Sequence, residues 1–79
     1  MTNSLHSDRY REMLEVLTRA RAEAGITQSE LAAKLGKPQS YVSKVERGER
    51  RIDVIEFGLI ARALKRRASD LFATLGLDH

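Results

Sequence analysis

Five hydrogen-bonding side chains within nine consecutive residues could form a surface that binds another molecule. They are the amide, hydroxyl and cationic groups of Gln39, Ser40, Ser43, Lys44 and Arg47. On an α-helix they share an arc of about 140°, separate from an apolar arc that contains Tyr41, Val42 and Val45. A solvated helix face tends to favour Glu, Lys and Ala, which form helices well and keep a chain soluble. The composition of this face therefore indicates a partner.

The charge around this segment leaves two interpretations of that partner open. Residues 34–51 contain six basic residues and two acidic ones, whereas the whole chain carries a net charge of only +3. A local excess of positive charge favours a polyanion as the partner. A basic solvated face is the other interpretation, and charge alone does not decide between them.

Length and composition exclude several other classes of protein. The 79 residues suffice for one small domain, which we place at 1–79, without a separate sensor domain. The chain has no Cys, which removes disulfides and Cys-based zinc sites and suits a reducing cytoplasm. Its longest apolar run is about five residues, too short to span a membrane. The first ten residues lack the hydrophobic stretch of a signal peptide. We therefore expect a cytoplasmic protein with no membrane association.

The apolar spacing is helical almost throughout, and it predicts five helices. The first covers residues 8–24, with Ser7 as its N-cap and Gly25 as its stop. Its predicted buried stripe consists of Tyr10, Met13, Leu14, Leu17, Ala20 and Ala24. Arg21 falls within this stripe, so its guanidinium requires a carboxylate partner or a route to solvent.

Two short helices are expected next, separated by a turn at Gly36. Thr27 and Glu30 have the spacing of a capping box that starts the first of them. Pro38 lies at the first turn of the following helix, where its missing N–H costs nothing, and Gly48 ends that helix.

The last two helices are expected after residue 53. Asp53 and Glu56 form a second box-like pair that starts the fourth helix, with Ile52 and Phe57 as a hydrophobic staple. The predicted core positions of this helix are Ile55, Leu59, Ile60, Ala63 and Leu64. The basic run 65–67 then leads into a short helix that carries Leu71, Phe72 and Leu75.

The segment TQSELAAKLGKPQSYVSKVERGERR resembles the signature of the Cro/phage-repressor-like helix-turn-helix family, also called the Xre family. The matching residues are Thr27-Gln28, Leu31-Ala32, Gly36, Gln39-Ser40, Val42-Ser43 and Glu46-Arg47-Gly48. The resemblance covers about residues 13–72. It implies an all-α, compact five-helix lambda-repressor-like domain whose third helix lies in the DNA major groove.

The resemblance also implies roles for single residues. Gln39, Ser40 and Lys44 match positions that contact base edges, with Ser43 nearby. The expected contacts to the DNA backbone are Gln28, Tyr41, Arg47, Arg50 and Arg51. For Tyr41, a place in the core is an equally open alternative.

The family frequently carries a buried Arg on its first helix paired with a Glu at the end of the third. The resemblance therefore implies a structural ion pair between Arg21 and Glu46. The chain departs from the family after Leu64, where many members have Gly and an apolar residue but this chain has Lys65, Arg66 and Arg67. This run is interpreted as a solvated turn, with extra phosphate-binding charge as the alternative.

The sequence gives little support to catalysis, a cofactor or a metal site. His6 and His79 lie near opposite ends of the chain, and the serines have no neighbouring base. We therefore do not expect an enzyme. The resemblance to the Xre family implies instead a transcriptional regulator, which we expect to be a repressor that binds double-stranded DNA as a homodimer. Four apolar residues together exceed what a short last helix can bury, and we expect some of them at the dimer interface: Leu71, Phe72, Leu75 and Leu77. The alternative is an antitoxin-type module that binds a protein partner and also its own promoter.

Overall fold

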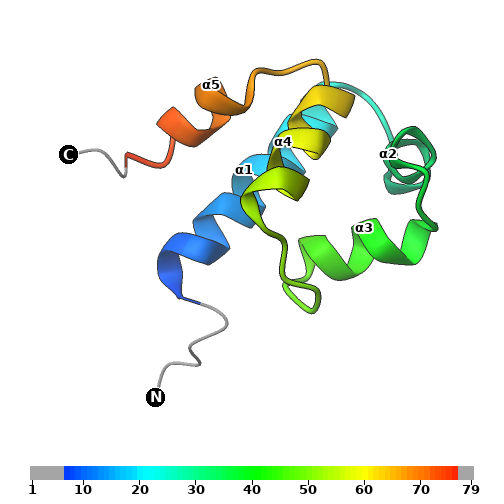
Figure 1. The fold of residues 1–79 in the computed structure, drawn as a ribbon, viewed down its shortest axis with the longest axis horizontal. Helices are drawn as coiled ribbons and strands as arrows, with labels where there is room; N and C mark the ends of the chain where they lie inside the picture. The colour runs from blue at the N-terminus through cyan, green and yellow to red at the C-terminus, as the bar shows by residue number, and fades with distance from the viewer. Residues whose placement is uncertain (1–6, 77–79) are drawn as a thin grey trace.

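The computed structural model describes residues 7–76, which form five helices and no strand. The helices are α1 (Asp8–Glu23), α2 (Gln28–Leu35), α3 (Gln39–Glu46), α4 (Val54–Ala63) and α5 (Ala68–Ala73). In Figure 1, α1 and α4 overlap in the centre of the view, α2 and α3 lie on the right, and α5 lies on the left. The all-α, five-helix architecture predicted from the sequence is confirmed.

The predicted helix starts have a physical basis in side-chain caps. The Ser7 hydroxyl accepts a hydrogen bond from the Tyr10 N–H at 3.1 Å, as an N-cap of α1 should. Complete capping boxes start α2 at Thr27 and α4 at Asp53, each with a Glu three residues later. Pro38 lies one residue earlier than expected, as the N-cap of α3.

One apolar cluster joins all five helices. Each helix contributes at least one fully buried side chain, for example Leu17, Leu31, Val45, Ile60 and Leu71. Since all the helices share this core, the surfaces of α3 and α4 are held in fixed positions relative to each other.

The predicted buried face of α4 is wrong in part. Ile55 and Leu59 are 67% and 51% exposed, whereas Phe57 and Ala61 are buried with Ile60 and Leu64. The buried set follows the helical spacing i, i+3, i+4, i+7, with the large Phe57 ring inside. Because α4 is apolar on almost every side, hydrophobic periodicity did not distinguish the two faces. Ala24, expected in the stripe of α1, is exposed and lies just after that helix.

The structure also contradicts part of the predicted dimer interface. Leu71 and Leu75 are 2% and 7% exposed within this chain, so they are not available for a second copy. They are buried because α5 packs against both α1 and α4. Phe72 is 49% exposed, and Leu77 lies outside the described residues.

Candidate nucleic-acid interface

The polar face of α3 is exposed along its whole length. Gln39, Ser40, Lys44 and Arg47 are exposed and Ser43 is partly exposed, whereas Val42 and Val45 on the opposite side are buried. The turn before α3 is tight because Gly36 adopts a left-handed conformation with φ of 69°, which favours glycine. The structure thus brings the five polar side chains singled out in the sequence onto one accessible surface.

A buried ion pair fixes α3 to α1 from behind. Arg21 Nε lies 2.7 Å from Glu46 Oε2, and Arg21 Nη2 lies 3.1 Å from Glu46 Oε1. The remaining terminal nitrogen of Arg21 donates to the Ile26 carbonyl at 2.9 Å. The side chains of Arg21 and Glu46 are only 17% and 10% exposed, so solvent screens the pair weakly. Arg21 therefore has the carboxylate partner that its place in an apolar stripe requires.

Gln28 connects this ion pair to the start of α3. Its Nε2 donates to Glu46 Oε1 at 2.8 Å, and its Oε1 accepts from Gln39 Nε2 at 2.8 Å. A chain of hydrogen bonds therefore runs from α1 through Glu46 and Gln28 to the exposed Gln39. Sequence reasoning assigned Gln28 to a phosphate and missed this connection. The spacing alone gave no signal for it, because the connection depends on how α2 and α3 pack.

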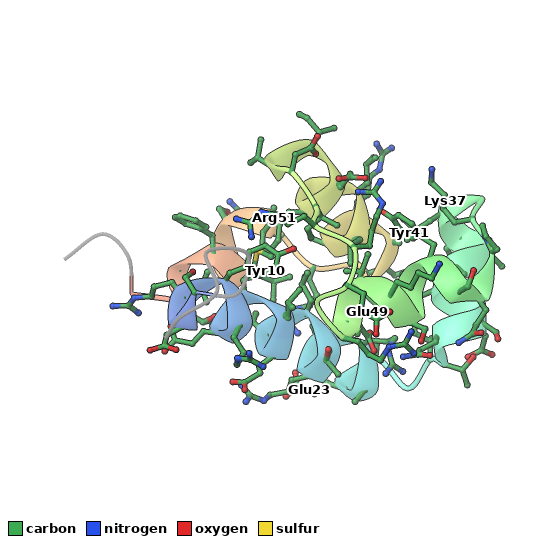
Figure 2. The ribbon with its side chains drawn as sticks, turned by 90° about the horizontal axis from the view of Figure 1, so that it is seen from below. Tyr10, Glu23, Lys37, Tyr41, Glu49 and Arg51 are labelled. Atoms are coloured by element: carbon green, nitrogen blue, oxygen red, sulfur yellow. The ribbon has the colours of Figure 1, made fainter. Side chains whose placement is uncertain are left out.

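Tyr41 lies where α3 meets the loop that leads to α4, and it is partly exposed. Its hydroxyl donates to Glu56 Oε2 at 3.2 Å. Lys37 Nζ and Arg50 Cζ lie 5.2 Å and 5.3 Å from the centroid of its ring. Burial, followed by the negative charge of Glu56, raises the pKa of the Tyr41 phenol, so the phenol stays neutral at physiological pH. Tyr41 is thus only partly buried and contacts Glu56 and Lys37, the second of which lies near it in Figure 2.

The arginines at the end of α3 are exposed and paired with carboxylates. Arg47 forms two 3.0 Å contacts with Glu49 and donates to Ser43 Oγ at 2.6 Å. The hydrogen bonds and positive charge of Arg47 lower the pKa of Glu49, which is therefore ionised at neutral pH. Arg50 Nη2 lies 2.8 Å from Glu56 Oε2. Exposed pairs of this kind are weak, so a phosphate can replace the carboxylate at small cost.

The part of the chain that the structure describes forms neither a metal-binding cluster nor a membrane span. Between residues 7 and 76, no three His, Asp or Glu side chains lie together in a way that could hold a metal ion. No helix in that part of the chain is long and apolar enough to cross a membrane. Among residues 7–76, four large apolar side chains are exposed: Val54, Ile55 and Leu59 on α4, and Phe72 on α5.

Comparison with known proteins agrees with this geometry. The helix-turn-helix family model matches residues 17–71. A curated relative, the uncharacterized HTH-type transcriptional regulator y4dJ of Sinorhizobium fredii (strain NBRC 101917 / NGR234), is 46% identical over 46 residues. That match covers 58% of this chain and 60% of the relative, which is less than two thirds of the relative's length.

Two solved structures are close to the whole fold. An XRE-family like protein from Pseudomonas syringae pv. tomato str. DC3000 is 49% identical with a TM-score of 0.86, covering 92% of this chain and 89% of that one. The restriction-modification controller protein C.Esp1396I was solved as a tetramer in complex with its natural 35 base-pair operator. It is 29% identical with a TM-score of 0.79, covering 87% of this chain and 91% of that one.

Proposed function

The chain belongs to the Xre family of helix-turn-helix DNA-binding transcriptional regulators, and from that premise we propose that it represses transcription by binding a pseudo-palindromic operator as a homodimer. Helix α3 of each copy enters the major groove of one half-site. The observation that carries this proposal is the exposed Gln, Ser, Lys and Arg face of α3, held from behind by the Arg21–Glu46 pair. No catalytic step is part of the proposal.

Base contacts are proposed for four residues of α3: Gln39, Ser40, Ser43 and Lys44. Gln39 can pair with adenine through two hydrogen bonds, and Lys44 can donate to the acceptor atoms of guanine. Ser40 and Ser43 lie between them on the helix and complete the base-contacting face. The 2.8 Å hydrogen bond from Gln39 to Gln28 restricts the Gln39 amide before DNA arrives, which lowers the entropy lost on binding.

Backbone contacts are proposed for the residues around that face. Gln28, on the first turn of α2, has a second N–H besides the one that Glu46 accepts, and this N–H can donate to a phosphate. Tyr41 and Arg47 border the base-contacting face, while Arg50 and Arg51 lie in the loop that follows α3. Arginine suits this role because its planar fork binds two phosphate oxygens at once.

The homodimer is proposed to form through the outer face of α4. Ile55 and Leu59 are one helical turn apart and are exposed, although side chains of this kind are usually buried. A second copy related by two-fold symmetry would cover them and would place the two α3 helices about 34 Å apart. The operator-bound controller protein is a tetramer, which supports assembly of this fold on DNA.

Selection of bound duplexes from a random DNA library tests the proposal. The expected result is an enriched pseudo-palindrome bound by two copies of the chain. Affinity for it should fall steeply as salt rises, since phosphate contacts release counterions. A chain that enriches no sequence and binds all duplexes equally weakly would not be this regulator. A chain that is monomeric alone, and binds DNA only with a second protein, would instead be the antitoxin-type module.

A further inference from the structure

Tyr10 makes two contacts with the loop that follows α3, although its own helix is the first in the chain. The Tyr10 hydroxyl accepts a hydrogen bond from the Ile52 N–H at 3.1 Å, across 42 positions of sequence. The Arg51 guanidinium carbon lies 4.3 Å from the centroid of the Tyr10 ring. Figure 2 shows Tyr10 and Arg51 next to each other, with Tyr41 on the other side of the same loop.

Two arginines of this loop therefore lie over different tyrosine rings. Arg50 lies over Tyr41 of α3, and Arg51 lies over Tyr10 of α1. Stacking uses the flat face of a guanidinium, whereas a phosphate binds at its edge, so the two interactions are compatible. Two stacked arginines lose less freedom on meeting a phosphate than two mobile ones.

The hydroxyl of Tyr10 has a specific use here. The Tyr10 ring is partly buried and packs against the core, a role that Phe would fill equally well. The hydroxyl gives the Ile52 N–H an acceptor where the chain passes from the loop toward the cap of α4. It therefore fixes the backbone next to Arg51.

We propose that Tyr10 is a positioning residue for DNA binding, which holds the loop of residues 47–53 so that Arg51 meets a phosphate of the operator. This inference rests on the proposed function. It adds a second residue of α1, besides Arg21, to those that hold the DNA-binding surface, and the sequence had assigned this residue only to the core. Tyr10 acts through Arg51 and does not itself touch DNA.

The hydrogen bond can be tested without DNA. Tyr10→Phe keeps the ring and its stacking on Arg51 but removes the acceptor, so the Ile52 amide should exchange with solvent at least about tenfold faster. The Asp53 amide, which donates to Glu56 at 2.9 Å, is the internal control and should keep its protection. Unchanged protection of the Ile52 amide would overturn the proposal.

Binding of the full chain to its selected operator tests the role. Tyr10→Leu removes both contacts, and the loss of one phosphate contact should lower the salt slope by about 0.9 and the affinity at 0.1 M salt up to about eightfold. Base preference should not change. Val16→Ala on the same helix is the matched control, because Val16 is partly buried and packs against the core. It should destabilise the fold and leave affinity unchanged well below the melting temperature.

A double substitution separates a role in binding from a role in stability. If Tyr10 acts through Arg51, Tyr10→Leu in an Arg51→Ala chain should change affinity less than about twofold. An equal loss in both backgrounds would overturn the inference. Wild-type affinity and salt slope in both Tyr10 variants would also overturn it, while the proposed function would stand. A wild-type chain without salt-dependent DNA binding would instead overturn the proposed function.

Discussion

The outer faces of α3 and α4 belong to neighbouring helices of similar length, yet they differ in chemistry. The face of α3 presents amides, hydroxyls and cations, and contains no large apolar side chain. The face of α4 presents Val54, Ile55 and Leu59, with exposed fractions of 78%, 67% and 51%. Neither is the Glu-, Lys- and Ala-rich surface that a helix needs only for solubility. The chemistry of each face therefore indicates a different partner: a hydrogen-bonding polyanion for α3 and an apolar protein surface for α4.

The two helices are also attached to the domain in different ways. Only two side chains of α3 are fully buried, Val42 and Val45, and the helix is further held by the hydrogen bonds of Glu46 to Arg21 and Gln28. Helix α4 is held by a larger apolar set around Phe57 and Ile60. A directional network suits the proposed role of α3, because side chains that contact bases must be placed to within a fraction of an ångström. Apolar packing suffices for a face whose partner is another apolar surface.

The strongest test of this difference is to break the attachment of α3. Arg21→Ala or Glu46→Ala leaves one buried charge without its partner, which typically costs about 3–5 kcal/mol. We expect each variant to lower the melting temperature strongly, and the double variant to cost less than the sum. The measurement is a double-mutant cycle by thermal or urea unfolding. If the losses of unfolding free energy in the two single variants simply add in the double variant, Arg21 and Glu46 do not stabilise each other.

The apolar face of α4 is tested by adding a charge to it. Ile55→Asp would bury two carboxylates in a symmetric interface, and we expect it to weaken the dimer by about 2–4 kcal/mol. Sedimentation at tens of micromolar should then show a monomer. Circular dichroism should show unchanged helix content. Ala22→Asp, at an exposed position of α1, is a matched control that adds the same single charge outside α4. A dimer that survives Ile55→Asp would place the interface elsewhere.

The faces of α3 and α4 also differ in how well the sequence predicted them. The five helices, both capping boxes and the polar arc of α3 follow from local patterns, because caps and amphipathic spacing act within one or two turns. The buried face of α4 did not follow, because Ile55 and Leu59 compete with Phe57 and Ala61 at the same helical spacing. The Gln28–Gln39 and Tyr10–Ile52 hydrogen bonds join residues from different elements, so only the packed fold creates them.

Substitutions on the polar face of α3 should have a weaker effect, and they should change the preference for particular base pairs. Gln39→Ala or Lys44→Ala should cost roughly 1–3 kcal/mol of discrimination at particular base pairs. Both side chains are exposed, so thermal stability should hardly change. The measurement is binding of each variant to operators that differ by single base pairs. If both variants lose affinity uniformly and keep the wild-type preferences, this face does not contact base edges.

The matched control for that experiment is a residue beside the face. Arg50→Ala removes a proposed phosphate contact and an exposed ion pair with Glu56. It should weaken binding to every duplex about equally and reduce the salt slope by about 0.9. A change in base preference with Arg50→Ala would move the boundary between the base-contacting and phosphate-contacting residues.

The smallest expected effect concerns the end of α4, which differs from the ends of the three helices before it. Each of the first four helices ends with a left-handed residue and a hydrogen bond from the next N–H back five positions, as in Lys37 N to Ala32 O and Arg66 N to Ala61 O, both 2.9 Å. The left-handed residue is Gly25, Gly36 and Gly48 in α1 to α3, but after α4 it is Lys65, with φ of 59°.

Lys65→Gly should therefore stabilise the domain by about 0.5–1 kcal/mol, because the left-handed conformation costs a residue with a Cβ more than it costs glycine. Gly36→Ala is the matched control, since a Cβ there meets nothing within 4 Å and only the backbone strain at φ +69° remains. It should destabilise by about 1 kcal/mol. The measurement is thermal unfolding of both variants, combined with operator binding. Unchanged affinity of Lys65→Gly would support the solvated-turn interpretation of residues 65–67, whereas a reduced salt slope would make Lys65 a phosphate contact retained despite its strain.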